Sequence, residues 1–381
     1  MGPIQPLFLI INSTNKQLDG SLGTNRADVK KCHIIAQNDY QAAMCWLNEY
    51  KHKETTYRSY KKEAERLLLW CVYQAKKPLS SLNQDDFNAY FDFLANPTPY
   101  SLWCSPKKAN RNSKDWRPFT GPLKPAAQMT AISIIGSLMS YLVNARYLEF
   151  NPLTIMRKYS KRKASFVEQK LHLQSRILET DEWAKMLEVL NKYPEENTHQ
   201  KDEKLRLNLI VSLLYLLGLR VGDLVTHTWN AFQKINGKWW FIAKGKGDKV
   251  GTIPVNQQLL NIVKNYRNHL QLLEEPAGED LPLITSWRKN TAITSRHINR
   301  LLKDLALKTA AQFVHNPDKQ EKLKRFSAHW LRHLSATMQD RVGIKFEHIK
   351  ANHRHENDNT TRKYIHAVDD ERHEDMEKLI I

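Results

Sequence analysis

The apolar run LIVSLLYLLGL at residues 209–219 constrains the fold of this chain more than any other segment. A helix formed by this run has apolar side chains on every side, so it is stable only where other elements surround it. The run is shorter than the roughly 20 apolar residues that a membrane-spanning helix needs. We therefore expect a buried helix at the centre of a globular domain. Gly218 is expected to end that helix, with Arg220 following at the edge of the core.

A β-hairpin is predicted after this helix. The strand patterns KWWFIA (238–243) and KVGTIPV (249–255) flank the turn residues KGKGD (244–248). The remainder of the second half has mainly helical patterns. We therefore expect a mainly α fold, in which an α+β domain carries a small antiparallel β-sheet.

The first half is predicted to be helical. Residues 36–95 hold three helical patterns, and in one of them Tyr57, Tyr60 and Ala64 begin a single apolar stripe at three- and four-residue steps. Another helical pattern ends at Asn151-Pro152. The expected organisation is an irregular leader or arm (1–35), a helical domain (36–155), a basic linker (156–170), a second domain (171–367) and a tail (368–381).

The charge balance favours a polyanionic partner. The chain has 58 Lys and Arg against 40 Asp and Glu, a formal net charge of +18. Each phosphate that such a protein neutralises releases counterions, so nucleic acid is favoured over a membrane surface or the ribosome. The four cysteines form no CxxC pair, which predicts thiols in a reducing cytoplasm. The N-terminal residues do not have the pattern of a signal peptide.

Two basic segments are candidates for DNA contact. The loop 96–125 places Trp103 and Trp116 among cations, and the linker 156–170 is basic and poor in apolar residues. The alternatives are a disordered insertion for the loop and an ordinary solvated face for the linker. The candidate DNA-binding residues are Lys107, Lys108 and Arg111 in the loop, and Arg157, Lys158, Lys161, Arg162 and Lys163 in the linker.

Four short segments of the second domain contain candidate catalytic residues. They hold Arg220 with Asp223 in GLRVGDL, Lys246 in the hairpin turn, His329 and Arg332 in SAHWLRH, and His355 with Tyr364 in HRHENDNTTRKYIHA. Each has a plainer interpretation by itself: a structural Arg–Asp pair, an exposed hairpin, a capped helix start, a packing tyrosine. A zinc site at His329 and His333 lacks the glutamate of the HExxH pattern. No metal site is expected.

In this order, the six residues Arg220, Lys246, His329, Arg332, His355 and Tyr364 resemble the tyrosine recombinase (phage integrase) family. The resemblance spans most of residues 171–367, and residues 50–155 look like the family's helical core-binding domain. Two departures stand out. Asp223 occupies a position where the family commonly has Glu, and His353-Arg354 precedes His355 where the family commonly has Leu-Gly. The nine-residue interval to Tyr364 favours His355 over His353 as the family's histidine.

The resemblance implies a site-specific recombinase that needs neither metal, ATP nor another cofactor. Tyr364 would be the nucleophile that becomes joined to the 3′ phosphate. Arg220 and Arg332 would clamp the phosphate, and His329 would accept the tyrosine proton. Lys246 would protonate the departing 5′ oxygen, and His355 would donate a hydrogen bond to the phosphate. Asp223 would support Arg220.

The resemblance also implies partners. The two domains would close around duplex DNA, and a homotetramer on two recombination sites would exchange strands through a Holliday junction. Accessory DNA-bending proteins are possible partners, and no membrane partner is expected. The tail 368–381 would dock on a neighbouring protomer, or pack within its own chain. The protein would act in the cytoplasm on nucleoid DNA, in a bacterium or the host of a mobile element.

Other functions stay open at this point. A type IB topoisomerase-like enzyme uses similar chemistry as a monomer, and telomere-resolving enzymes are more distant relatives. A catalytically inactive DNA-binding regulator could use the same fold. An RNA-binding protein would account for the charge but for none of the motifs.

Overall fold

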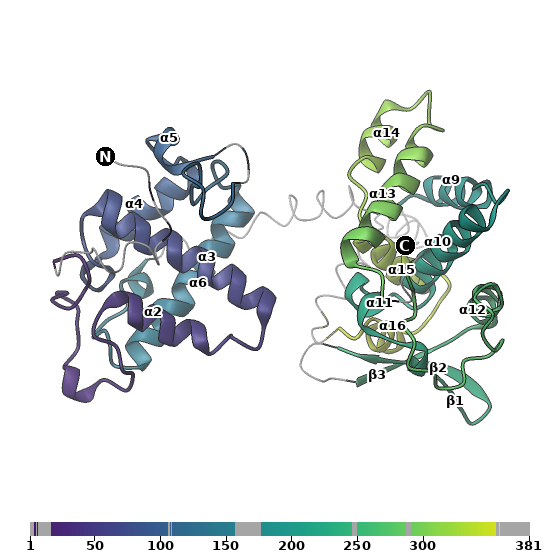
Figure 1. Ribbon diagram of the computed structural model, residues 1–381, viewed down its shortest axis with the longest axis horizontal. Helices are drawn as coiled ribbons and strands as arrows, with labels where there is room; N and C mark the ends of the chain where they lie inside the picture. Colours follow the sequence, from purple (N-terminus) through teal and green to yellow (C-terminus); the bar gives the residue numbers. More distant parts are fainter. Residues whose placement is uncertain are drawn as a thin grey trace, which may run out of the picture. The chain divides into compact units, whose positions relative to one another are not determined.

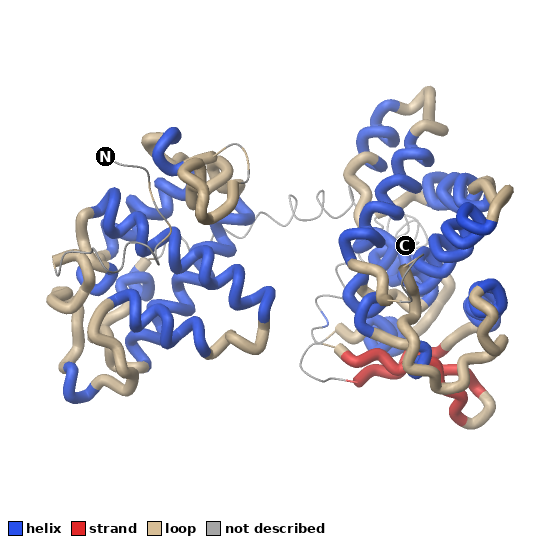
Figure 2. The backbone as a smooth tube through the Cα atoms, viewed as in Figure 1, coloured by secondary structure: helices blue, strands red, loops and turns tan. Residues whose placement is uncertain are grey.

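The chain is mainly helical, with one small antiparallel sheet, as predicted (Figures 1 and 2). This computed structural model describes residues 4, 6, 17–105, 107, 109–156, 177–245, 250–286, 291–355 and 358. They belong to two compact units, Met1–Lys163 and Ala164–Ile381, each with its own hydrophobic core. The roles assigned to the two parts of the chain stay predictions.

Unit 1 is a bundle of helices in which α6 contacts α2, α3 and α4. Its α-helices are α2 (Asp39–Asn48), α3 (Glu54–Trp70), α4 (Gln84–Ala95), α5 (Tyr100–Trp103) and α6 (Pro125–Asn144). Both α2 and α6 pack against α3. Every residue from Glu63 to Trp70 is buried, so the predicted single stripe is wrong for this half of the helix. Neighbouring segments cover it on all sides.

The basic loop 96–125 is part of this core. Trp103 and Phe119 in the loop are 0% and 1% exposed. Arg66 of α3 donates from Nε to the carbonyl oxygen of Pro118 at 3.0 Å, and its guanidinium lies 4.3 Å from the centre of the Phe119 ring. The described part of the loop is therefore folded, and the alternative of a disordered insertion is wrong for it.

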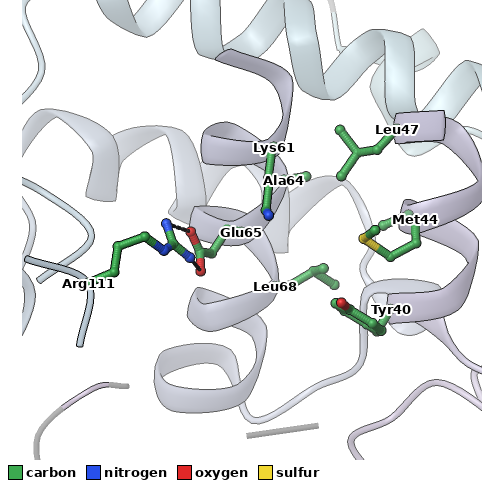
Figure 3. A pocket seen from close by; sticks show the side chains of 9 residues that line it. Tyr40, Met44, Leu47, Lys61, Ala64, Glu65, Leu68 and Arg111 are labelled. Carbon is green, nitrogen blue, oxygen red and sulfur yellow. Dashed lines mark hydrogen bonds and ion pairs between the residues drawn. The ribbon is translucent and has the colours of Figure 1, made fainter. Parts of the chain in front are cut away.

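Arg111 ties the same loop to α3. Its Nη1 donates to Oε2 of Glu65 at 2.9 Å (Figure 3). Its guanidinium lies 5.2 Å from the centre of the Trp116 ring. The Glu65 side chain is only 7% exposed, so this ion pair is partly shielded from water. Arg111 thus has a structural partner, and its contact with DNA stays a prediction.

The segment 17–35 is irregular, as predicted, but it is fixed to unit 1. The Asn25 amide donates to the carbonyl of Ser80 at 2.8 Å, and the Ala27 amide to the carbonyl of Tyr147 at 3.1 Å. Buried Asp39 accepts hydrogen bonds from the same two residues, from the Ser80 amide and from the Tyr147 hydroxyl. Burial raises the pKa of Asp39 to about 6.

Helix α6 is long and apolar enough to cross a membrane by length and composition alone. In the structure it supplies core residues to unit 1, among them Ile135, Leu138 and Leu142, which are each 0% exposed. These side chains face the bundle, so the helix has a packing role that accounts for its composition.

Unit 2 surrounds the helix predicted from residues 209–219. Its α-helices are α9 (Thr180–Asn191), α10 (Thr198–Leu216), α11 (Val221–Thr226), α12 (Gln257–His269), α13 (Ser295–Ala310), α14 (Pro317–Leu323), α15 (Ala328–Arg341) and α16 (Phe346–His353). Helix α10 contacts α9, α11, α12, α13 and α15, and its residues from Leu209 to Leu214 are buried. The predicted central helix is confirmed.

The sheet of unit 2 has the order β1–β2–β3 and lies against α16 (Figure 2). Strands β2 (Lys238–Lys244) and β3 (Val250–Pro254) form the predicted hairpin. Strand β1 (Phe232–Ile235) was not predicted. It joins β2 through Asn236-Gly237, whose φ angles of 50° and 74° suit a tight hairpin turn.

Trp103 tests whether the basic loop belongs to the core of unit 1. We expect Trp103→Ala to lower the free energy of unfolding of this unit by about 3–5 kcal/mol, because a fully buried ring leaves a cavity. Chemical denaturation of the full chain measures the change. Leu22→Ala is the control, because Leu22 is 77% exposed and its loss should change stability by less than about 0.5 kcal/mol. Equal midpoints for Trp103→Ala and the wild type would contradict this packing.

Candidate active site

The end of α10 begins the site. Gly218 follows the helix with φ of +59°, a left-handed conformation that favours glycine. A Cβ atom at this position would lie 2.5 Å from the His353 ring. The close packing of His353 against Gly218 therefore depends on the missing side chain. The chain then turns into α11, with Arg220 exposed at its start.

Arg332 joins three segments at this point. It lies in the first half of α15, is 3% exposed, and donates from Nη1 to the carbonyl of Gly218 and from Nη2 to the carbonyl of His353. A guanidinium stays charged in a protein, and its burial requires such partners. Helix α15 starts after Ser327 as predicted, although the Ser327 side chain makes no capping hydrogen bond.

The two candidate histidines have different surroundings. His353 is 0% exposed, and its Nε2 lies 3.4 Å from the Ser335 hydroxyl and 3.3 Å from the Gln339 amide nitrogen. Burial, followed by the charge of Arg332, lowers the pKa of His353 well below its ordinary value. His353 is thus a core histidine, in agreement with the predicted preference for its neighbour at 355.

His355 lies among the other candidate catalytic groups. Burial is the largest cause that lowers its pKa to about 4, followed by the charges of Arg332, Arg220, His329 and Arg354. The predicted residues Arg220, His329 and Arg332 are therefore close enough to His355 for their charges to act on it. His355 is neutral at pH 7, so the positive charge there comes from the arginines.

Asp223 supports Arg220 as the sequence suggested, by a backbone contact. Its Oδ2 accepts a hydrogen bond from the Arg220 amide at 2.8 Å and so holds the first turn of α11. The same carboxylate forms an ion pair with Arg354, whose side chain and that of Asp223 are each 10% exposed. Arg354 stands in the position where the family commonly has Gly.

His227 is a site-supporting residue that the sequence did not reveal. Its Nδ1 donates to the carbonyl of Asp223 at 2.8 Å, and its Nε2 accepts from the Lys244 amide at 2.9 Å. The ring therefore links α11 to the end of β2, just before the hairpin turn. The second contact joins residues 17 positions apart, and no local pattern signals it.

His329 and His333 do not form part of a metal site within the described ranges. Their ring centres are 4.1 Å apart with the rings at 75°, and His329 is exposed while His333 is buried. Over those ranges, no three His, Cys, Asp or Glu side chains are grouped so that they could hold a metal ion.

Several predicted residues lie outside the described part of the chain. They are Lys246, Tyr364, the tail 368–381, Lys108 and the linker residues Arg157, Lys158, Lys161, Arg162 and Lys163. Lys107 is described and exposed. Four of the six predicted catalytic residues, Arg220, His329, Arg332 and His355, lie in the described part of the chain, and their catalytic roles stay predictions.

Comparison with known proteins assigns a family to this arrangement. The model of the phage integrase family matches residues 176–371, just over half of the chain. The chain belongs to the phage integrase family. The matched span contains all six residues that carry the predicted tyrosine recombinase pattern.

Curated relatives in the phage integrase family are tyrosine recombinases. The chain is 29% identical over 182 residues to tyrosine recombinase XerC of Staphylococcus aureus (strain bovine RF122 / ET3-1), covering 48% of this chain and 54% of the relative. It is 28% identical over 171 residues to tyrosine recombinase XerD of Rhizobium meliloti (strain 1021), covering 45% and 50%. The matched segments thus span about half the length of these relatives.

Solved structures of this family share the fold. The XerH site-specific recombinase bound to palindromic difH substrate, a post-cleavage complex, has a TM-score of 0.61 at 17% identity, covering 90% of this chain and 85% of the other. The Tn1549 transposon integrase in complex with transposon right end DNA has a TM-score of 0.57 at 14% identity, covering 89% and 99%. At these identities the likeness establishes the fold alone.

The buried histidines predict a pH dependence of stability. The unfolded chain binds protons at His353 and His355 near their ordinary pKa of about 6.5, whereas the folded chain resists protonation of His355 until about pH 4. The unfolded state therefore binds more protons in this window, and stability falls as the pH falls from 7 towards 4. We expect His355→Asn to make this loss shallower.

Denaturant midpoints of the wild type and His355→Asn, measured between pH 7 and pH 5, test this expectation. Asp39 titrates in the same window with the opposite sign, because its carboxyl has a raised pKa. Its contribution is the same in both proteins and cancels in the difference. Parallel pH profiles would show that His355 titrates normally in the folded protein.

Proposed function

We propose that this protein is a site-specific DNA recombinase that cuts and rejoins strands through a phosphotyrosine at Tyr364. The observation that supports the proposal most strongly is that the charges of Arg220, His329 and Arg332 all act on His355, although these residues come from three separate segments. Membership of the phage integrase family and the likeness to tyrosine recombinases agree with it.

The charges of this group suit a phosphodiester. Two guanidiniums bind a phosphate with directional hydrogen bonds, and they stabilise charge that spreads over its nonbridging oxygens. Arg332 is held in place by two carbonyl groups before any ligand arrives, so its charge needs no reorganisation. A neutral His355 keeps one N–H for donation to the phosphate.

The proposed reaction conserves the phosphodiester bond. The Tyr364 oxygen attacks phosphorus while the bond to the 5′ oxygen breaks, which leaves a 3′-phosphotyrosyl link. The tyrosine proton passes to His329, and Lys246 protonates the departing 5′ oxygen. A 5′ hydroxyl from another strand then attacks the link and releases Tyr364. The cycle requires neither ATP nor a metal ion.

We further propose that the two units bind duplex DNA between them, with the predicted lysines and arginines of the loop and linker against phosphates. A homotetramer on two sites would exchange strands through a Holliday junction, with accessory DNA-bending proteins as further partners. The protein would work in the cytoplasm, on nucleoid DNA. A groove of about 340 Å³ beside β3 and α15, lined by Ile253, Met338 and Val342 among others, is the candidate acceptor for the apolar residues Met376, Leu379 and Ile380 of the otherwise charged tail.

A covalent adduct tests the nucleophile. On a nicked target duplex, we expect the wild type to form a detergent-resistant protein–DNA adduct in the presence of EDTA. Tyr364→Phe should bind the duplex with unchanged affinity and form no adduct, because only the hydroxyl is removed. If the Phe variant forms an adduct, Tyr364 is not the nucleophile. If the wild type forms an adduct only when EDTA is absent, the reaction depends on a metal ion.

Strand exchange separates recombinase from topoisomerase. Two duplexes that carry the target site should yield recombinant products, because the second 5′ hydroxyl comes from another strand. Relaxation of any supercoiled plasmid without exchange between sites would instead support the type IB topoisomerase-like alternative. DNA binding without cleavage under all conditions would support the inactive regulator.

A further inference from the structure

Arg354 adopts a backbone conformation that is unusual for arginine. It caps the C-terminal end of α16 with φ of 51° and ψ of 47°, in the left-handed region. This conformation costs free energy for a residue with a Cβ atom, and glycine adopts it readily. The chain thus keeps the backbone path of a glycine while it carries a long cationic side chain. The contacts of the Arg354 side chain show which interactions accompany this free-energy cost.

The guanidinium of Arg354 forms an ion pair with Asp223 in the first turn of α11. Its Nη2 donates to Oδ2 of Asp223, and its Nη1 lies 3.4 Å from Oδ1. The two side chains are each 10% exposed, so this two-pronged pair is well shielded from water. Because Asp223 also accepts the Arg220 amide at 2.8 Å, the pair fixes the residue that begins the helix.

The aliphatic part of the Arg354 side chain packs against strand β3 of the β2–β3 hairpin. Its Cγ and Cδ atoms are so close to Gly251 of β3 that a Cβ atom there would lie 2.8 Å from both. Gly251 pairs with Ala243, and the next pair, Lys244 with Val250, is the last that the structure describes before residues 246–249. The aliphatic part therefore contacts β3 one residue from the end of the β2–β3 pairing.

The opposite strand of the hairpin base is held by α11 as well. The Lys244 amide donates to His227, which in turn donates to the carbonyl of Asp223. Arg354 and His227 thus connect both strands to the same residue, Asp223. His355, the next residue after Arg354, lies in the candidate site. One side chain therefore links the helix start, the hairpin base and the histidine segment.

We propose that Arg354 is a positioning residue: through Gly251 and Asp223 it fixes the ends of β2 and β3 on either side of residues 246–249, and so supports the proton transfer from Lys246 to the 5′ oxygen. This inference rests on the proposed recombinase function. Arg354 acts here through another residue and is not assigned a contact with DNA. Removal of a group that orients a metal ligand typically changes metal affinity or activity by about 10–100-fold, and we expect an effect of this size for a group that orients Lys246.

The test compares Arg354→Gly with the wild type in adduct formation on a nicked duplex. Glycine keeps the left-handed backbone, so the variant should fold, and a thermal unfolding midpoint checks this. We expect cleavage to slow by about 10–100-fold at saturating protein, with DNA affinity little changed. Arg146→Gly is the matched control, because Arg146 is another arginine with a left-handed backbone, at φ of 53°, but is exposed in unit 1.

A second substrate separates positioning of Lys246 from a general loss of structure. When sulfur replaces the bridging 5′ oxygen, the departing thiolate needs no proton, because a thiol has a pKa of about 8.5. We expect this substrate to restore cleavage by Arg354→Gly to within a few-fold of the wild type, as for Lys246→Ala. Arg220→Ala should not be restored, since its charge is needed with either leaving group.

The outcomes distinguish this inference from the proposed function. If Arg354→Gly cleaves the ordinary substrate as fast as the wild type, or is slow on both substrates, Arg354 does not position Lys246. If Arg146→Gly slows cleavage equally, the effect comes from removing a cation and not from the hairpin contact. If the wild type forms no adduct with either substrate, the recombinase proposal fails, and this inference fails with it.

Discussion

The two hydrogen bonds from the Arg332 guanidinium to the carbonyls of Gly218 and His353 hold the candidate site together. A buried guanidinium cannot lose its charge, so its burial is stable only while these acceptors are present. The acceptors terminate α10 and α16, and Arg332 belongs to α15. Arg220 follows Gly218 by two residues, and His355 follows His353 by two. The position of both groups therefore depends on Arg332.

The charge of this cation acts on neighbouring groups. Burial keeps His355 neutral at pH 7, and the charges of Arg332 and of the exposed Arg220 also lower the pKa of His355. Asp223 connects the site to the sheet, because its carboxylate and its carbonyl bind different partners. Helix α10, from whose end the site starts, contacts five other helices of unit 2. The candidate site thus begins at the end of the central helix of this unit.

Features with a strong local signal were predictable from the sequence. The apolar run 209–219 gave its buried helix, and the strand patterns gave the β2–β3 hairpin. Strand β1 was missed although Asn236-Gly237 is a strong hairpin signal, because only four residues precede the turn in that strand. The left-handed Arg354 and the His227 bridge depend on contacts between distant segments, and the same is true of the Arg111–Glu65 pair. Neither periodicity nor composition records such contacts.

The central claim is that this site delivers a tyrosine hydroxyl to a DNA phosphate. Peptide mapping of the trapped protein–DNA adduct by mass spectrometry tests it most directly. After nuclease and protease digestion, the account predicts one peptide that carries a residual nucleotide, with the modification on Tyr364. A nucleotide on any other tyrosine, or on a serine or histidine, would contradict the account.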